Sequence, residues 1–176
     1  MEEKPSTARL ALKWGLISGV IFMIWTTIIN VAGLFTNQSI QWVSLIISIV
    51  IIVMAMREYR SLNSGFMSFG EGVGLGTLLS VVSGLVSITY NLIYTNFIDP
   101  TIRQQMLDNA REQLENRGMS DSDIEKAMEI TEKVQSPGLQ FGIGILFAAI
   151  FGVLISLVVA AFLRRNRPPF SDFENQ

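Results

Sequence analysis

The chain has 176 residues, of which 49% are hydrophobic, and its 13 basic and 15 acidic side chains leave a formal net charge of −2. It contains neither cysteine nor histidine, which excludes disulfides, thiolate metal sites and any catalytic triad that depends on histidine. We therefore expect no zinc, haem or iron–sulfur chemistry, no catalytic, cofactor-binding or metal-binding residues, and no cofactor.

The charged residues leave four long apolar runs that contain no Asp, Glu, Lys or Arg. These runs are Trp14–Phe35, Ile40–Met56, Gly72–Ile98 and Leu139–Leu163. A charged side chain at the centre of a bilayer helix costs about 3 kcal/mol, and about 20 apolar residues cross the hydrocarbon core. The sequence thus predicts an all-α fold, a four-transmembrane-helix bundle that forms one integral membrane domain over residues 1–176. A soluble core built from four such runs is the less favoured alternative.

The first run follows a short basic segment that carries Lys4, Arg9 and Lys13. A secretory signal peptide has a shorter apolar region and ends at a small-residue cleavage site. Here the apolar run is long, and Asn30-Val31-Ala32 makes only a poor site. We expect the first helix to stay in the membrane as a signal-anchor.

The second run, Ile40–Met56, is the shortest of the four. It is long enough to span if Gln41 and Arg57 lie at the two interfaces, with the arginine side chain extending toward water. Its sequence is rich in Ile and Val and has only Ser44 and Ser48 as small residues. We therefore expect this helix to face mainly lipid.

The other three spans carry small residues at helical spacing, which lets helix backbones approach closely in a membrane. The members are Gly15 and Gly19 in the first span; Gly72, Gly76, Ser80, Ser83, Gly84, Ser87 and Asn91 in the third; and Gly138, Gly142, Ala148, Gly152, Ser156 and Ala160 in the fourth. A seam inside one chain is the first interpretation, a homo-oligomer through these faces the second, and a pore lining the third. Asn30 and Asn91 are expected to hydrogen-bond between helices.

The glycines between Gly70 and Gly76 resemble a nucleotide-binding loop only superficially. Neither a strand before them nor a Lys-Ser/Thr pair after them is present, and they lead directly into a span. Carboxylates or histidines at membrane depth are typical of proton-coupled transporters. Here Glu71 and Asp99 lie at opposite ends of the third span, with only Tyr90 and Tyr94 as weak titratable groups between them.

Residues 99–136 form the one sizeable segment between spans, and they predict an acidic helical hairpin. Asp99-Pro100 is a good helix start, Gly118 a left-handed helix end, and Ser120 the cap of a second helix with Asp123 three residues on. An apolar stripe follows each helix: Ile102, Met106, Ala110 and Leu114 on the first, and Ile124, Ala127, Met128, Thr131 and Val134 on the second. These stripes either pack on each other or on the spans, which we favour, or form a docking surface for a protein partner.

The basic residues predict the orientation. Eight of them lie at the N-terminus, between the second and third spans, and in the tail 164–176, which we expect to be flexible; the hairpin carries five basic and nine acidic residues. Because Lys and Arg accumulate on the cytoplasmic side, both termini should be cytoplasmic and the hairpin should lie outside. The expected location is a bacterial inner membrane.

The order of several short motifs resembles a bacterial family known as domain of unknown function 4199, found largely in Bacteroidota. The motifs are the basic start of the first helix, Tyr59 followed by Ser64-Gly65-Phe66-Met67-Ser68-Phe69, Tyr90-Asn91 followed by Ile98-Asp99-Pro100, the acidic hairpin with Met119-Ser120 and Ile124-Glu125, and the final span. The resemblance covers nearly the whole chain. It implies an inner-membrane protein and carries no catalytic residues over.

Two functions from different classes fit these observations. The first is a non-catalytic scaffold, accessory or regulatory subunit that presents the acidic hairpin outside the membrane. The second is a small transporter or channel component, which the four spans and the Gly/Ser/Asn faces favour. An intramembrane enzyme ranks last, because the spans offer only Ser, Thr, Asn and Tyr as polar groups. The lipid bilayer is the expected partner in every case, and no nucleic acid is expected.

Overall fold

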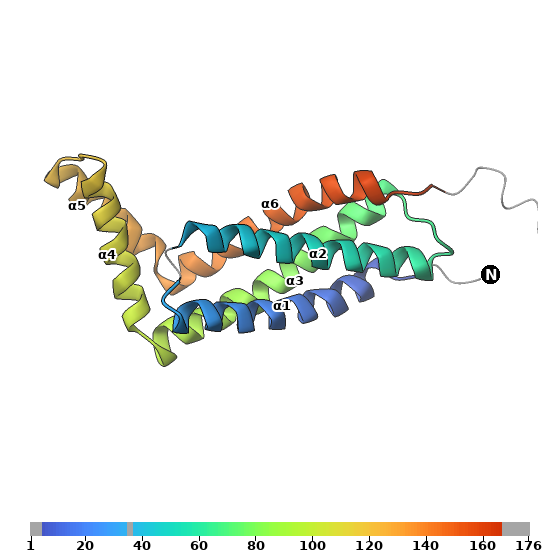
Figure 1. Cartoon of the computed structure of the whole chain (residues 1–176), viewed down its shortest axis with the longest axis horizontal. Coiled ribbons are helices and arrows are strands. Elements are labelled where there is room, and N and C mark those ends of the chain that lie inside the picture. Colours follow the sequence, from blue (N-terminus) through green and yellow to red (C-terminus); the bar gives the residue numbers. More distant parts are fainter. Residues whose placement is uncertain (1–4, 35–36, 167–176) are drawn as a thin grey trace, which may run out of the picture.

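The structure, a computed structural model, describes residues 5–34 and 37–166, so most of the predicted flexible tail lies outside the described residues. The described chain is built from helices (Figure 1). Their bounds are α1 Thr7–Val31, α2 Gln38–Leu62, α3 Phe69–Ile93, a π-helical turn η1 Tyr94–Ile98, α4 Thr101–Asn116, α5 Asp121–Val134 and α6 Pro137–Leu163.

Four helices of the described chain, α1, α2, α3 with η1, and α6, are long and apolar enough to cross a membrane. The all-α, four-span prediction is therefore confirmed. The helices extend beyond the charge-free runs. Helix α1 begins at Thr7 because the Ser6 side chain accepts a hydrogen bond from the Arg9 backbone N–H, and α2 continues past Arg57 to Leu62. Charged residues in the terminal turns lengthen the helices without entering the hydrophobic centre.

Helix α3 is the centre of the bundle. It packs along α1 on one side and along α6 on the other, while α2 makes fewer contacts and lies over α3 between α1 and α6 (Figure 1). The end at which α1 begins, with residues 62–69 and 163–165, is called the proximal end below. The other end, with residues 31–34 and helices α4 and α5, is called the distal end.

Glycines allow the close approach of α3 to its two neighbours. A Cβ atom placed on Gly152 of α6 would lie 2.5 Å from the Ser80 Cβ atom of α3, and one on Gly84 would lie 2.5 Å from the Cβ atom of Ala148. A Cβ atom on Gly19 of α1 would lie 2.6 Å from the Val86 Cβ atom. No real side chain tolerates these distances. The predicted seam inside one chain is thus confirmed at these positions, whereas Gly138 and Gly142 have open space beside them.

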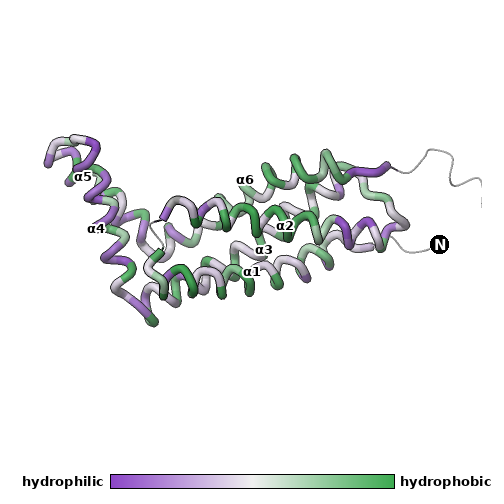
Figure 2. Tube along the Cα trace, viewed as in Figure 1, coloured by the Kyte–Doolittle hydropathy of each residue, from purple (hydrophilic) through white to green (hydrophobic). Residues whose placement is uncertain are grey.

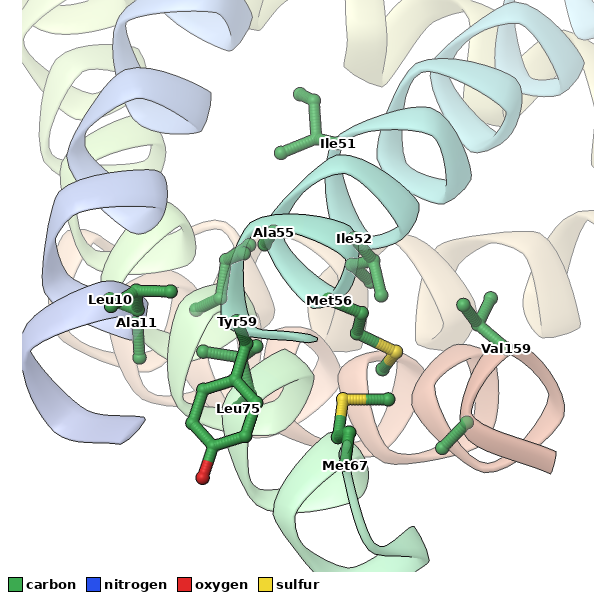
Figure 3. Packing of buried hydrophobic residues seen from close by; sticks show 12 residues of the cluster. Leu10, Ala11, Ile51, Ile52, Ala55, Met56, Tyr59, Met67, Leu75 and Val159 are labelled. Atoms are coloured by element: carbon green, nitrogen blue, oxygen red, sulfur yellow. The ribbon is translucent and has the colours of Figure 1, made fainter. Parts of the chain in front are cut away.

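The core lies in the proximal half of the bundle (Figure 3). Its buried members come from all four spans and from the connection before α3: Leu10, Ala11, Ile51, Ile52, Ala55, Met56, Tyr59, Met67, Leu75, Leu79, Val159 and Ala160. Met67 also pairs with Arg165 through two backbone hydrogen bonds of 2.9 and 2.8 Å, which tie the connection before α3 to the end of α6. These two hydrogen bonds hold the two segments together at the proximal end.

The expectation that the second span faces mainly lipid is wrong for its proximal half. Ile52, Ala55, Met56 and Tyr59 are each no more than 1% exposed. Large side chains, rather than a small-residue face, fill the space between α2 and the layer of α1, α3 and α6. The distal half of α2 does fit the expectation, because Trp42 is 66% and Ile46 is 59% exposed. Figure 2 shows the apolar colouring of the long helices and the polar colouring of α4 and α5.

Candidate functional site

Helices α4 and α5 form the largest element outside the four spans, and the name "α4–α5 pair" is used for residues 101–134. Figure 1 shows the pair across the distal end of the bundle, transverse to the long helices. Helix α3 leads into it through the π-helical turn, in which Tyr94 and Thr95 are buried. A π-helical turn at this place redirects the chain without a break in its backbone hydrogen bonding.

The predicted start of α4 is shifted by one residue. Pro100 is the N-cap and Thr101 the first helical residue. The Asp99 carboxylate still acts at this helix end, because its Oδ1 atom accepts hydrogen bonds from the Thr101 backbone N–H at 3.1 Å and from the Thr101 hydroxyl. The Asp99 carboxylate therefore stabilises a turn at Pro100 and does not occupy the N-cap position that was expected.

The connection between the two helices follows the predicted chemistry. Gly118 adopts a left-handed conformation with φ of 73° and ends α4. Ser120 is the N-cap of α5, and its side chain accepts a hydrogen bond from the Asp123 backbone N–H. The Ser120 hydroxyl in turn donates to the Asp123 carboxylate at 2.7 Å. This short turn brings α5 back into contact with α4.

The apolar stripes of the pair are partly covered. Ile102 and Ile124 are each 3% exposed, and Ala110, Leu114, Ala127 and Met128 are half-buried. Met106 and Val134 remain 42% and 40% exposed. Part of the apolar surface of the stripes is therefore used in packing within the molecule.

Acidic residues form a continuous stripe along α5. Asp121, Glu125, Glu129 and Glu132 recur at spacings of three or four residues, so they share one side of the helix, and all four are exposed. Glu129 accepts a hydrogen bond from Lys133 at 2.7 Å, one turn away. We call this set the acidic stripe. On α4, Asp108, Glu112 and Glu115 lie on the face opposite the apolar stripe, and Glu115 pairs with Arg111 at 3.5 Å.

A residue outside the predicted stripes is the most exposed large apolar side chain of the pair. Ile130 is 63% exposed and borders the predicted stripe of α5, because it follows Ala127 by three residues and precedes Val134 by four. The helical spacing that marks it was therefore present in the sequence, and the prediction left it out.

A second feature, a cavity of about 210 Å³, lies inside the bundle and was not predicted. All four spans contribute to its wall, among them Ser18 and Phe22 of α1, Ser48 of α2, and Phe151 of α6. Helix α3 contributes the residues Leu79, Ser80, Ser83, Gly84 and Ser87. The serines of the third span were predicted to form a packing face, and the structure shows that part of this face lines open space.

The hydrogen bonds between spans also differ from the prediction. The Asn30 Nδ2 atom is buried and finds no partner among the described residues, so this asparagine does not join two helices. Instead, Ser83 donates to Ser18 at 2.8 Å, the Trp25 Nε1–H donates to the Ser44 hydroxyl at 2.8 Å, and the Thr27 and Tyr90 hydroxyls share a hydrogen bond of 2.5 Å. Two short hydroxyl side chains meet only in the Ser83–Ser18 pair, next to the close contacts of Gly15 and Gly19 with α3.

The glycines that superficially resemble a nucleotide-binding loop lie in a helix. Gly70–Gly76 lies in the first turns of α3, which the Ser68–Glu71 capping box begins. A Cβ atom on Gly72 would lie 2.9 Å from the Ala160 Cβ atom, so this glycine serves the contact with α6. Within residues 5–34 and 37–166, no cluster of three Asp or Glu side chains could hold a metal ion.

Comparison with known proteins agrees with the resemblance found in the sequence. No curated protein and no solved structure matches the chain. A family model described as "Protein of unknown function (DUF4199)" matches residues 13–165, which include all four spans and the α4–α5 pair. The four apolar helices of the chain are those of a multi-pass membrane protein, and the chain belongs to the family of unknown function known as DUF4199.

Proposed function

We propose that the protein is a non-catalytic scaffold or accessory subunit of a bacterial inner membrane, with both termini in the cytoplasm and the α4–α5 pair outside. The acidic stripe of α5 carries the proposal. Four exposed carboxylates on one side of a short helix form a surface of single sign, while the apolar stripes of the pair are partly covered. A surface of this kind favours a partner with basic side chains.

The architecture supports a binding role over a catalytic one. The pair is held on the bundle by short connections, through η1 and Asp99 before α4 and through residues 135–136 before α6. Short connections restrict the movement of the pair, which lowers the entropy that its surface loses when it binds. The bundle itself supplies the anchor, because α3 packs closely on α1 and α6.

The orientation can be tested with single cysteines, since the natural chain has none. Ser122→Cys places a thiol at the start of α5, and Ser61→Cys places one at the proximal end of α2. An impermeant maleimide added to intact cells, with any outer membrane permeabilised, should label position 122 and leave position 61 unlabelled. Labelling of position 61 alone would contradict the proposed topology.

The binding role is tested by charge reversal on the two helices of the pair. The double variant Glu125→Lys with Glu132→Lys reverses part of the acidic stripe, and Glu112→Lys with Glu115→Lys makes the same change in net charge on α4. After purification in mild detergent from the native membrane, the wild type and the α4 variant should retain a common partner that the α5 variant loses. Equal retention, or a wild type that purifies alone and without self-association, would contradict the proposal.

The second candidate, a transporter or channel component, is favoured by one observation, the serine-lined cavity. All four spans line it, and it lies beside the middle of α3. Toward the proximal end it meets Ile52 and Leu79, which are 1% and 2% exposed, and then the core. Transport would therefore require the core to open. Solute flux in reconstituted vesicles that changes in Ser87→Leu would favour this function, and flux equal to that of empty vesicles would argue against it.

A further inference from the structure

A small polar cavity lies where the α4–α5 pair joins the distal end of the bundle (Figure 1). Its volume is about 60 Å³. Its wall consists of Thr95 and Asn96 of η1, Arg103 and Met106 of α4, Gln135 at the end of α5, and Gln140 in the first turn of α6. This cavity is called the Arg103 pocket below. It brings together segments that are up to 45 residues apart in the chain.

Arg103 carries the one charge among the described residues that line the pocket. Its side chain is half-buried, and within residues 5–34 and 37–166 it makes neither an ion pair nor a hydrogen bond. Asp99 lies four residues before it, but the Asp99 carboxylate accepts its hydrogen bonds from Thr101. A guanidinium group that is half-buried without a counter-charge has lost part of its hydration and gains most from an anion.

Two amide side chains place neutral donors in the same wall. Gln135 and Gln140 are half-buried, and neither side chain forms a hydrogen bond with another described residue. Their nitrogen atoms and those of Arg103 are not among the sealed, unpartnered polar atoms of the described chain, so they are open to a molecule in the pocket. A guanidinium group with amide N–H groups beside it is a donor set that suits an oxyanion.

The size of the Arg103 pocket selects a compact anion. Its volume corresponds to roughly two water molecules at about 30 Å³ each, which leaves room for a tetrahedral phosphate group but not for a nucleotide or a sugar. The planar guanidinium group can donate to two oxygen atoms of a phosphate group at once. Since none of the described residues in the wall is acidic, no lining carboxylate repels such a group.

The pocket lies at the level of the membrane surface. Its wall is built from η1, which ends the span Phe69–Ile98, and from the first turn of α6, which begins the span Pro137–Leu163. Next to the lining residues, Phe97, Ile98 and Leu139 are 82%, 58% and 51% exposed. Phospholipid headgroups lie at the ends of membrane spans, and acyl chains begin just below them. A phospholipid therefore supplies both a phosphate group for the pocket and an apolar partner for these side chains.

From these observations we infer that the Arg103 pocket binds the phosphate group of a phospholipid from the leaflet at the distal end. Arg103 pairs with the phosphate group, Gln135 and Gln140 donate hydrogen bonds to it, and the acyl chains lie along the ends of the two spans. The bound lipid joins α4 to the start of α6 and so holds the α4–α5 pair on the bundle. The site is separate from the acidic stripe and does not depend on a protein partner there.

Native mass spectrometry of the full-length protein, released from detergent micelles, tests the inference. The protein is titrated with dioleoylphosphatidylglycerol, with dioleoylglycerol, which has the same acyl chains but no phosphate group, and with ammonium phosphate. Phosphatidylglycerol should form a tight adduct that dioleoylglycerol does not form. A tight adduct of inorganic phosphate without one of phosphatidylglycerol would overturn the assignment to a lipid, and equal binding of the two lipids would overturn the role of the phosphate group.

Two variants and one control locate the site. Arg103→Gln removes the charge and should raise the dissociation constant of the tight phosphatidylglycerol adduct at least about tenfold. Gln140→Glu keeps Arg103 but gives it a carboxylate as a partner, which competes with the phosphate group and should weaken the adduct as strongly. Arg117→Gln removes the same charge from an exposed position at the end of α4 and should leave the dissociation constant unchanged. The wild-type constant in Arg103→Gln or in Gln140→Glu would overturn the inference, as would an equal loss in Arg117→Gln.

Discussion

The proximal and distal halves of the bundle use the same four helices but pack them differently. In the proximal half, Met56, Met67 and Leu75 have no exposed surface and side chains from all four spans form one core. In the distal half, α3 still approaches its neighbours closely at Gly19 and Gly144, but α2 is largely exposed. The two halves therefore differ mainly in the packing of α2, which buried large side chains hold in the proximal half.

The largest expected effect belongs to the proximal core. Leu75→Ala removes a side chain with 0% exposure and should lower the free energy of unfolding by about 2–5 kcal/mol, because a cavity remains. Leu78 is three residues away on the same helix and 46% exposed. Leu78→Ala should therefore change the free energy of unfolding by less than about 0.5 kcal/mol. Unfolding by sodium dodecyl sulfate in mixed micelles measures both. Equal losses would remove the distinction between core and lipid-facing surface.

The next effect tests the close approach of α3 and α6. Gly152→Ala brings a Cβ atom to 2.5 Å from the Ser80 Cβ atom and should lower the free energy of unfolding by about 1–3 kcal/mol through overpacking. Gly142→Ala lies in the distal half of the same helix, where nothing is within 4 Å of the new atom. It should be neutral or stabilise by up to about 1 kcal/mol. The same unfolding measurement separates the two, and a stabilising Gly152→Ala would disprove the seam.

A smaller effect concerns the tie between α1 and the distal half of α2. Trp25→Phe removes the donor to the Ser44 hydroxyl. It should lower the free energy of unfolding by about 0.6 kcal/mol, and by at most about 1.7 kcal/mol, as for other hydrogen bonds between membrane helices. Hydrogen exchange should increase in residues 40–48 while residues 52–59 stay protected. Uniform exchange along α2 in the variant would show that the two halves of this helix are not independent.

The smallest effect is expected from the ion pair at the proximal end. Lys13 and Glu58 are 2.7 Å apart, with side chains 53% and 28% exposed. Since water screens such a pair, Lys13→Gln should lower the free energy of unfolding by about 0.2–1 kcal/mol, and by less at high salt. Lys133→Gln removes a pair within α5 that is more exposed and should leave the unfolding of the bundle unchanged. A change of several kcal/mol for either variant would mean that ion pairs, rather than packing, hold the bundle.

Much of the fold could be predicted from the sequence, because the membrane imposes a simple rule on charge. The four charge-free runs correspond to α1, α2, α3 with η1, and α6. Local chemistry was equally informative at Gly118, which has the predicted left-handed conformation, and at Ser120, which caps α5. Each of these features depends only on neighbouring residues in the chain.

Features that depend on the placement of one helix against another could not be predicted. The burial of Ile52 and Met56 follows from the position of α2 over α3, which no period in its uniformly apolar sequence reveals. The cavity of about 210 Å³ likewise depends on how side chains from all four spans meet. The serines on α3 were visible, but a small residue fits a tight seam as well as a cavity wall, and Ser80 does both, because it lines the cavity and lies close to Gly152.

We propose that the proximal half anchors the protein and that the acidic stripe at the distal end binds a partner. A photo-crosslinking amino acid placed in native membranes at position 125, on the stripe, tests this most directly when compared with position 54. Met54 is 49% exposed on the proximal half of α2, where only lipid is expected. We predict a discrete protein adduct at position 125 that is absent at position 54. The same adduct at both positions, or none at position 125, would contradict the account.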